Sequence, residues 1–324
     1  MRFPVFDIED NVQFEQLALE IYQYQLEHNT AYQQYCSFLR KPLASQVSDI
    51  PFLPISFFKT HKITTEPEKK PEIVFTSSGT TGTSTSKHLV HNLEIYNQSL
   101  DHSFKKFYGN PEEYTILALL PHYLERTGSS LVYMVDRWIK HSNNSKSGFY
   151  LNNLQDLSVI LKELQQLDRK VILIGVTFAL LQLAEQFPMA LDNTIIIETG
   201  GMKGMRKEIV KPELHKILSS AFPKAQIHSE YGMTELLSQA YAPDGIHFKL
   251  PPWMQVSARD TNDPLSSIAH GKTGGLNVID LANIESCSFI ATQDLCKTYA
   301  DGTFEVLGRF DNSDIRGCNL LAIG

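Results

Sequence analysis

The chain has 324 residues, of which 42% are hydrophobic and 20% charged, a balance typical of a folded globular protein and not of a disordered one. A net charge of −7 and a pI near 5.9 argue against a nucleic-acid-binding surface, which is usually basic. No apolar run approaches the ~18 residues that a membrane helix needs, and the N-terminus lacks the apolar core of a signal peptide. The sequence therefore predicts a cytoplasmic protein with no nucleic-acid partner and no membrane span.

Four cysteines stand at positions 36, 287, 296 and 318, and no two of them form a Cys-x-x-Cys pair. That spacing argues against a zinc site. In a reducing cytoplasm we expect free thiols. Each cysteine is then either a small core residue or a nucleophile, and the sequence leaves both open.

The first 40 residues read as one long helix, because Phe14, Leu17, Ile21 and Leu26 recur at spacings of three to five. A cluster of prolines then breaks the chain into an irregular segment.

From residue 72 to residue 232, strand-like and helix-like runs alternate. The strand-like runs are 73–76, 115–120, 171–176, 194–198 and 226–229. The helix-like runs are 93–107, 154–167, 178–187 and 205–221. Short apolar strands separated by helices predict an α/β fold in which helices cover mixed sheets.

After Pro243 the pattern changes to short runs with Gly, Pro and Asp between them, namely 246–250, 276–280, 288–292 and 303–307. This pattern predicts a β-rich subdomain. We therefore divide the chain into an N-terminal helical segment (1–70), an α/β core (71–242), and a β-rich subdomain with a hinge-like tail (243–324). We expect the three parts to form one contiguous domain.

The stretch TSSGTTGTSTSK, residues 76–87, is the most informative feature of the chain. Its glycines let backbone N–H groups turn toward an anion, its hydroxyls add donors, and Lys87 supplies a mobile positive charge. Four residues separate Gly82 from Lys87, so the stretch is not a Walker A loop. Taken alone, it is either a loop that wraps a polyphosphate or a Gly/Ser/Thr linker.

A second candidate is the stretch SEYGMTE, residues 229–235. Gly232 lets the backbone turn, Thr234 offers a hydroxyl to a phosphate, and Glu235 offers a hard carboxylate to Mg²⁺. Tyr231 can stack on a flat base. The alternative is a strand-to-helix turn in which Glu235 only complements the helix dipole.

A third candidate is Asp294, with Arg309 on the next strand-like run. A carboxylate at a strand end suits two ribose hydroxyls, and the arginine can join it at the sugar or at a phosphate. The alternative is a structural ion pair at a hairpin.

Taken in this order, the three elements resemble the adenylate-forming superfamily of acyl-CoA synthetases, peptide-synthetase adenylation domains and firefly luciferase. Residues 77–87 resemble its phosphate loop, 230–235 its Tyr-Gly-x-Thr-Glu motif, and 271–276 its Gly-x-x-Gly-x-Leu turn. Asp294 resembles the aspartate of its Thr-Gly-Asp motif, although Gln293 replaces the usual glycine. Residues 199–202 resemble the loop that lies against adenine.

Within that superfamily the chain is most similar to the acyl-protein synthetases of the bacterial luciferase fatty-acid reductase complex. The segments PFLPISFFK (51–59) and IRGCNL (315–320) carry this resemblance. In most of the superfamily a lid of about a hundred residues, bearing a catalytic lysine, follows the Gly-Arg-x-Asp hinge. Only thirteen residues follow Asp311 here, so we expect the lid to be absent.

The resemblance implies that a carboxylic acid, expected to be a fatty acid, attacks ATP to give an acyl-adenylate, with Mg²⁺ as the metal. Glu235 is the implied metal ligand, and the implied catalytic residues are Lys87, Thr234, Glu235, His122 and Cys318. The implied ATP-binding residues are Thr76, Ser77, Ser78, Gly79, Thr80, Thr81, Gly82, Gly200, Gly201, Met202, Tyr231, Gly232, Asp294 and Arg309.

Cys318 is implied to accept the acyl group, or to relay it to an acyl-CoA reductase or acyl-carrier partner protein. The neighbouring Arg316 would raise its thiolate fraction. The alternatives are a buried cysteine that anchors the tail and, for His122, an ordinary loop histidine. At the level of the whole protein, the competing hypotheses are a short acyl- or aryl-CoA ligase and a weakly active nucleotide-binding subunit of a larger complex.

Overall fold

The computed structural model describes residues 3–77, 85–121, 128–150, 153–167, 169–200 and 209–310. Within these ranges the α-helices are α1 (Asn11–His28), α2 (Thr30–Leu39), α3 (Phe57–Thr60), α4 (Leu93–Tyr108), α5 (Ser130–Ser142), α6 (Leu154–Leu164), α7 (Thr177–Gln186) and α8 (Lys211–Ala221). Short 3-10 helices lie at Val5–Asp7, Val47–Asp49 and Pro111–Glu113.

The strands of the same residues form three sheets. One contains β4 (Tyr114–Leu119), β5 (Gly148–Phe149), β6 (Lys170–Gly175), β7 (Thr194–Glu198), β8 (Gln226–Tyr231) and β9 (Ala240–Ala242). The second contains β1 (Leu53–Pro54), β10 (Met254–Arg259), β11 (Thr273–Asp280), β12 (Phe289–Thr298) and β13 (Phe304–Arg309). The third is a hairpin of β2 (Ile73–Thr76) and β3 (Lys87–Val90).

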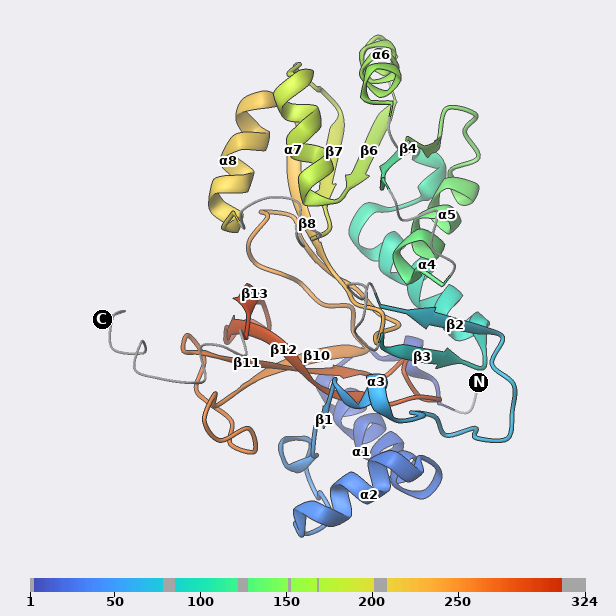
Figure 1. Cartoon of the computed structure of the whole chain (residues 1–324), viewed down its shortest axis with the longest axis vertical. Coiled ribbons are helices and arrows are strands. Elements are labelled where there is room, and N and C mark those ends of the chain that lie inside the picture. The colour runs from blue at the N-terminus through green and yellow to red at the C-terminus, as the bar shows by residue number, and fades with distance from the viewer. Residues whose placement is uncertain are drawn as a thin grey trace.

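The six-stranded sheet has the order β5-β4-β6-β7-β8-β9, with all neighbouring pairs parallel except β8 and β9. Its central strands are nearly continuous apolar runs, and all six residues of β4 are buried. Helices α7 and α8 lie together on one side of this sheet, and α4 and α5 lie on the other (Figure 1). Burial on both faces explains why these strands show no alternation of apolar and polar residues.

The five-stranded sheet lies in the other half of the molecule, next to α1 and α2 (Figure 1). Its strands follow the order β1-β12-β11-β10, and β13 also pairs with β12. The N-terminal part of the chain reaches this sheet through β1, which pairs with β12 in parallel: Leu53 lies beside Ile290 and Pro54 beside Ala291. The division into segments 1–70, 71–242 and 243–324 remains a prediction.

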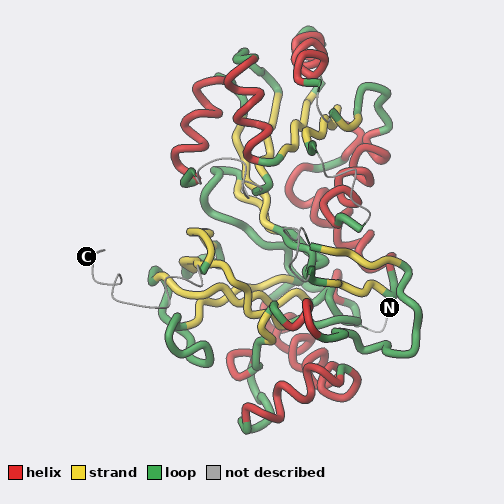
Figure 2. The backbone as a smooth tube through the Cα atoms, in the orientation of Figure 1, coloured by secondary structure: helices red, strands yellow, loops and turns green. Residues whose placement is uncertain are grey.

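Residues 232–239 connect β8 to β9 within the six-stranded sheet, and residues 281–288 connect β11 to β12 within the five-stranded sheet. Both segments are irregular, and together we call them the polar junction. Figure 2 shows such loop segments between the two groups of strands, beside the β2–β3 hairpin. Most residues of the junction are buried, so buried partners must satisfy its backbone polar groups. Gln25 is one such partner: its side-chain nitrogen donates to the carbonyls of Asn283 (3.0 Å) and Ile284 (2.9 Å).

The prediction of one long N-terminal helix is wrong, because α1 ends at His28 and α2 begins at Thr30. Asn29 between them is fully buried and extended (φ −103°, ψ 97°). Its side-chain oxygen accepts from the Tyr32 amide at 3.1 Å and caps α2, while its side-chain nitrogen donates to the Ser286 carbonyl at 2.9 Å. A contact with the polar junction therefore divides the helix.

The predicted strand at 246–250 is also wrong, since this segment makes only isolated bridges. A carboxylate oxygen of Asp244 accepts from the amides of Ile246 (2.9 Å) and His247 (2.8 Å) and turns the backbone locally. The other three predicted strands of this region correspond to β11, β12 and β13. The sequence pattern did not indicate β3, β5, β10 or α5. No helix within the described ranges is both long and apolar enough to cross a bilayer.

Candidate active site

Tyr231, at the end of β8, and Arg309, at the end of β13, meet at Asp294, which lies in the middle of β12 rather than at the strand end that the sequence suggested. Asp294 and Arg309 are paired in register on neighbouring strands, and the Arg309 Nε donates to Asp294 Oδ1 at 3.2 Å. The hydroxyl of Tyr231 donates to Asp294 Oδ2 at 2.8 Å. The Tyr231 ring is buried and makes edge contacts with Phe248 and Phe304. Burial, reinforced by Asp294, raises the Tyr231 pKa well above its ordinary value, so the phenol remains a donor.

The buried side chain of Arg259 holds the backbone next to this cluster. Its guanidinium donates to the carbonyls of Leu276 (2.6 Å) and Thr292 and lies over the ring of Phe310, 5.6 Å from the centroid. The hydroxyl of Thr292 in turn accepts from the Asp294 amide at 3.1 Å. Arg259 therefore holds the backbone of β11 at Leu276 and that of β12 at Thr292, two residues before Asp294.

Arg259 also explains one glycine of the stretch 271–276. A Cβ built on Gly275 would lie 2.7 Å from the guanidinium carbon of Arg259, closer than two such atoms can approach. Gly275 is therefore needed for the close packing of β11 against Arg259, in addition to any role in a turn.

Glu235 and Thr234 lie in the polar junction, directly after β8. The Glu235 side chain is buried, and burial raises the pKa of its carboxyl. A hydrogen bond from Ser86 opposes this rise, as do the more distant charges of Arg309 and Lys59. A buried carboxylate with a raised pKa is stabilised by an added cation, which suits a metal ligand.

The hairpin β2–β3 brings the two ends of the stretch 76–87 together. The Ser77 amide donates to the Ser86 carbonyl at 3.2 Å, and the Ser86 amide donates to the Ser77 hydroxyl at 2.9 Å. Along β3 the side chains alternate: Ser86 and His88 are buried toward the junction, whereas Lys87 between them is exposed. The two described ends of the stretch are thus paired as strands of a hairpin, with Thr76 beside Lys87.

Gly200 belongs to the stretch 199–202 that resembles the adenine loop, and its backbone contacts a buried polar cluster. Its amide donates to the Glu198 carboxylate at 2.9 Å, and its φ of +47° favours glycine. Lys211 also contacts Glu198, at 2.9 Å, so both flanks of the segment 201–208 meet one carboxylate. Burial tends to raise the Glu198 pKa, but Lys211 and Thr177 outweigh it and the pKa is lowered.

Glu230 lies in the same cluster and behaves in the opposite way. It accepts a hydrogen bond from the Thr199 hydroxyl, and no lysine among the described residues forms an ion pair with it. Burial, with the charge of Glu198, raises the Glu230 pKa to about 7. The cluster therefore holds one ionised carboxylate, Glu198, and one that titrates near neutrality.

The structure accounts for part of the predicted site only. Thr76, Ser77, Lys87, Gly200, Tyr231, Gly232, Thr234, Glu235, Asp294 and Arg309 lie within the described residues. Ser78, Gly79, Thr80, Thr81, Gly82, His122, Gly201, Met202 and Cys318 lie outside them. Sequence reasoning missed Ser86, His88, Arg259 and Asn283. The alternation Ser86-Lys87-His88 was the one local signal that could have indicated a strand facing the site.

The three described cysteines are poor nucleophiles. Burial raises the pKa of Cys36 to about 11 and that of Cys296 to about 12, and it also raises that of the buried Cys287. Because the thiolate is the reactive form, these positions are best explained as packing residues.

Several solved structures share this fold. A 2-hydroxyisobutyryl-CoA ligase in complex with 2-HIB-AMP and CoA matches with a TM-score of 0.69 at 9% identity, over 93% of this chain and 70% of the ligase. A luciferase-like enzyme from the mealworm Zophobas morio matches with a TM-score of 0.52 at 19% identity, over 74% of this chain and 57% of its own. ATP-bound MatB from Rhodopseudomonas palustris gives 0.53 at 17% identity, over 73% and 47%. The predicted fold class, an α/β adenylate-forming fold with mixed sheets, is confirmed.

The family of acyl-protein synthetases called LuxE matches residues 6–322, and the chain therefore belongs to it. A relative, the long-chain-fatty-acid–luciferin-component ligase of Vibrio harveyi, is 22% identical over 332 residues, which cover 92% of this chain and 84% of the relative. The protein is thus a ligase of the acyl-protein synthetase type, as the motifs indicated.

Proposed function

We propose that the protein activates a long-chain fatty acid with ATP and passes the acyl group to a cysteine thiol, its own Cys318 or that of a reductase partner. The observation that carries the proposal is the meeting of Tyr231, Asp294 and Arg309 beside Glu235. The name of the Vibrio harveyi relative supports a long-chain fatty acid as the substrate. That name also describes the relative as a ligase of a luciferin component.

On the nucleoside side, Asp294 accepts hydrogen bonds from the ribose hydroxyls. Tyr231 and Arg309 already fix its two oxygens, so the carboxylate is oriented before ATP arrives. Gly200, with Gly201 and Met202, lines the adenine together with Tyr231. Arg309, which is more exposed than Asp294, can reach a phosphate as well as the sugar.

On the phosphate side, the amides and hydroxyls of residues 76–82 and the ammonium group of Lys87 bind the β- and γ-phosphates, with Thr234 beside them. The residues present fit Mg²⁺, because Glu235 is a buried hard oxygen donor. No group of three metal-binding side chains occurs within the described ranges, which suits an ion bound by one carboxylate and the phosphates. Bound there, Mg²⁺ neutralises phosphate charge.

The proposed reaction has two steps, formation of the acyl-adenylate and transfer of the acyl group to a thiol. In the first, a carboxylate oxygen of the fatty acid attacks the α-phosphorus, the bond from this phosphorus to the bridging oxygen breaks, and pyrophosphate leaves with the electron pair. In the second, a cysteine thiolate, having lost its proton to solvent, attacks the acyl carbon, and AMP leaves as the carbon–oxygen bond breaks. His122 is a candidate contact for the fatty-acid carboxylate. Positioning and charge stabilisation supply most of the catalysis.

Exchange of pyrophosphate into ATP tests the first step. Incubation with a panel of fatty and aromatic acids should show exchange with long-chain acids, and Lys87→Ala should abolish it. ATP binding without exchange for any acid would replace the proposal with a nucleotide-binding subunit. Near-normal exchange in Lys87→Ala would remove that lysine from the mechanism.

Labelled fatty acid tests the second step. Wild-type protein should acquire a hydroxylamine-sensitive label, and Cys318→Ser should lose it while Cys36→Ser keeps it. Equal labelling of Cys318→Ser would reject Cys318 as acceptor. Thioester formation with free coenzyme A, in the absence of any partner protein, would favour an acyl-CoA ligase instead.

A further inference from the structure

The backbone that carries Thr234 and Glu235 is held by two buried side chains from distant parts of the chain. The ring nitrogen Nδ1 of His88, on β3, donates to the Thr234 carbonyl at 2.8 Å. The side-chain nitrogen of Asn283, after β11, donates to the Glu235 carbonyl at 2.7 Å. Two consecutive carbonyls thus each have a dedicated donor.

The segment 86–88 contacts both residues of this turn, Glu235 through Ser86 and Thr234 through His88. Ser86 hydrogen-bonds the Glu235 carboxyl, and His88, two residues along on the same face of β3, holds the preceding carbonyl. The next residues of the junction are fixed too, since Asp280 accepts from the amides of Leu237 (2.8 Å) and Ser238 (3.0 Å). Together with these contacts, His88 and Asn283 hold the backbone of residues 234–238 in a single conformation.

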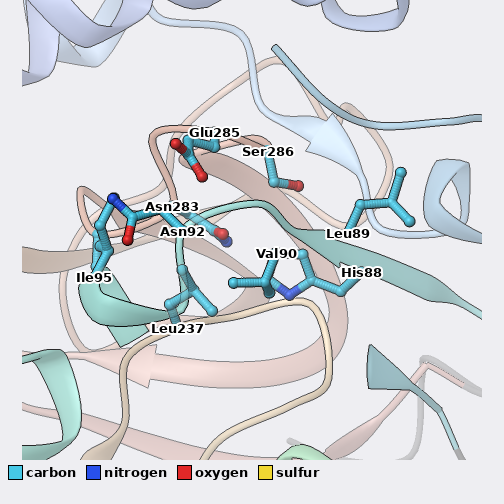
Figure 3. A pocket seen from close by; sticks show the side chains of 10 residues that line it. His88, Leu89, Val90, Asn92, Ile95, Leu237, Asn283, Glu285 and Ser286 are labelled. Atoms are coloured by element: carbon cyan, nitrogen blue, oxygen red, sulfur yellow. The ribbon is translucent and has the colours of Figure 1, made fainter. Parts of the chain in front are cut away.

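His88 and Asn283 also share a cavity of about 10 Å³, shown in Figure 3 together with the neighbouring Leu237, Glu285 and Ser286. Within the described residues, His88 Nε2 and Asn283 Oδ1 make no hydrogen bond of normal geometry. Burial lowers the His88 pKa to about 4, although Thr234 and Asn283 oppose the shift, so the ring is neutral and its one proton lies on Nδ1. Both unpaired atoms are then acceptors.

The two side chains lie close enough to interact directly, since the Asn283 side chain contributes to the pKa of His88. The amide of Asn283 cannot be flipped to remove the mismatch, because its nitrogen is needed by the Glu235 carbonyl.

We propose that His88 and Asn283 are positioning residues that hold the turn of Thr234 and Glu235 through its two carbonyls. This inference rests on the proposed function, which makes Glu235 the metal ligand. Without either donor a buried carbonyl is left unpaired, the turn relaxes, and Glu235 moves relative to the metal–nucleotide. Binding of the nucleoside, which uses Asp294, is unaffected.

The matched variants His88→Asn and His88→Gln test this. The side-chain nitrogen of asparagine falls near Nδ1 and can still reach the Thr234 carbonyl, whereas that of glutamine falls near Nε2 and cannot. Binding of Mn²⁺ with α,β-methylene-ATP is measured by electron paramagnetic resonance, and binding of AMP without metal by calorimetry. His88→Gln should weaken the Mn²⁺ complex about tenfold or more and leave AMP binding within twofold, while His88→Asn should stay near wild type. Asn283→Leu should behave like His88→Gln.

Equal Mn²⁺ binding by both His88 variants, or an equal loss of AMP and Mn²⁺ binding, would overturn the positioning role. The ¹⁵N resonances of His88 provide an independent readout, since a ring protonated at Nε2 instead of Nδ1 would also overturn it. Glu235→Gln, measured alongside, separates the two proposals. Unchanged Mn²⁺ binding there rejects the metal role and the inference with it, whereas a loss there with normal binding in His88→Gln rejects the positioning role alone.

Discussion

The six-stranded sheet and the polar junction are both largely buried but are stabilised in different ways. Residues Val171, Ile172, Leu173 and Ile174 of β6 are fully buried and hydrocarbon throughout. The junction is irregular backbone whose amides and carbonyls bond to Gln25, His88, Asp280 and Asn283. Apolar packing is non-directional, so it tolerates small shifts, whereas each hydrogen bond fixes one atom. The junction, not the sheet, carries Thr234 and Glu235.

The sheet side of this comparison predicts the largest effect on stability. Ile172→Ala should lower the free energy of unfolding by about 2–5 kcal/mol, because Ile172 is 0% exposed and its loss leaves a cavity. Pyrophosphate exchange by the folded protein should be unchanged. Urea unfolding measures the first quantity, with the more exposed Val159→Ala as control. A loss no larger than that of the control would mean that the sheet repacks freely.

The junction side is tested by Gln25→Leu, which keeps the size of the side chain. Two carbonyls and the amide of Ser288, which donates to the Gln25 side chain at 3.0 Å, lose their partners. We expect a loss of about 2–4 kcal/mol, since unpaired buried groups cost more than a hydrogen bond contributes. Exchange should fall too, because Asn283 is among the groups released. Normal pyrophosphate exchange in the folded variant would mean that the Gln25 contacts do not influence the active site.

The buried carboxylate cluster at the ends of β7 and β8 should make stability depend on pH. The folded-state pKa of Glu230 is about 7, above its ordinary value of 4.5, so between these values the folded state keeps a proton that the unfolded state loses. Stability is therefore fully present below pH 4.5 and falls as the pH rises toward 7, by at most about 3 kcal/mol. In Glu230→Gln this fall should flatten, as measured by urea unfolding at pH 5 and pH 8. If the free energy of unfolding of Glu230→Gln falls with pH as steeply as that of the wild type, another group causes the pH dependence.

The smallest effect concerns packing at the base of Asp294. Gly275→Ala should cost about 1–3 kcal/mol, since its Cβ would lie 2.7 Å from the Arg259 guanidinium carbon. Gly148→Ala, on edge strand β5 with no atom within 4 Å of the added Cβ, is the matched control. Thermal unfolding compares the two. Equal melting temperatures would mean that Arg259 moves aside without cost.

Sequence reasoning succeeded where the signal was local. The strand 194–198 coincides with β7, and α4 (Leu93–Tyr108) extends the predicted helix by one residue, because periodicity reports burial of a face. The pairing of Asp294 with Arg309 followed from motif order, and their register on β12 and β13 supports it. The roles assigned to these residues remain proposals.

The junction could not be predicted, because nothing local specifies it. Gln25 and Ser288 are 263 residues apart, and His88 and Thr234 are 146 apart, so each pair is defined only once the chain has folded. The helix break at Asn29 has the same origin, since its partner is Ser286. A buried polar side chain on a helix, such as Gln25, is visible in sequence only as an interruption of the apolar face.

The pairing of β1 with β12 has a consequence for synthesis of the protein. Pro54 lies beside Ala291, which is translated 237 residues later. At about 5–20 residues per second, the N-terminal segment leaves the ribosome roughly 10–50 s before its partner strand exists. During that interval Tyr32, fully buried in the finished protein, has no five-stranded sheet to pack against. The part of the chain that is made first is therefore among the last to be buried.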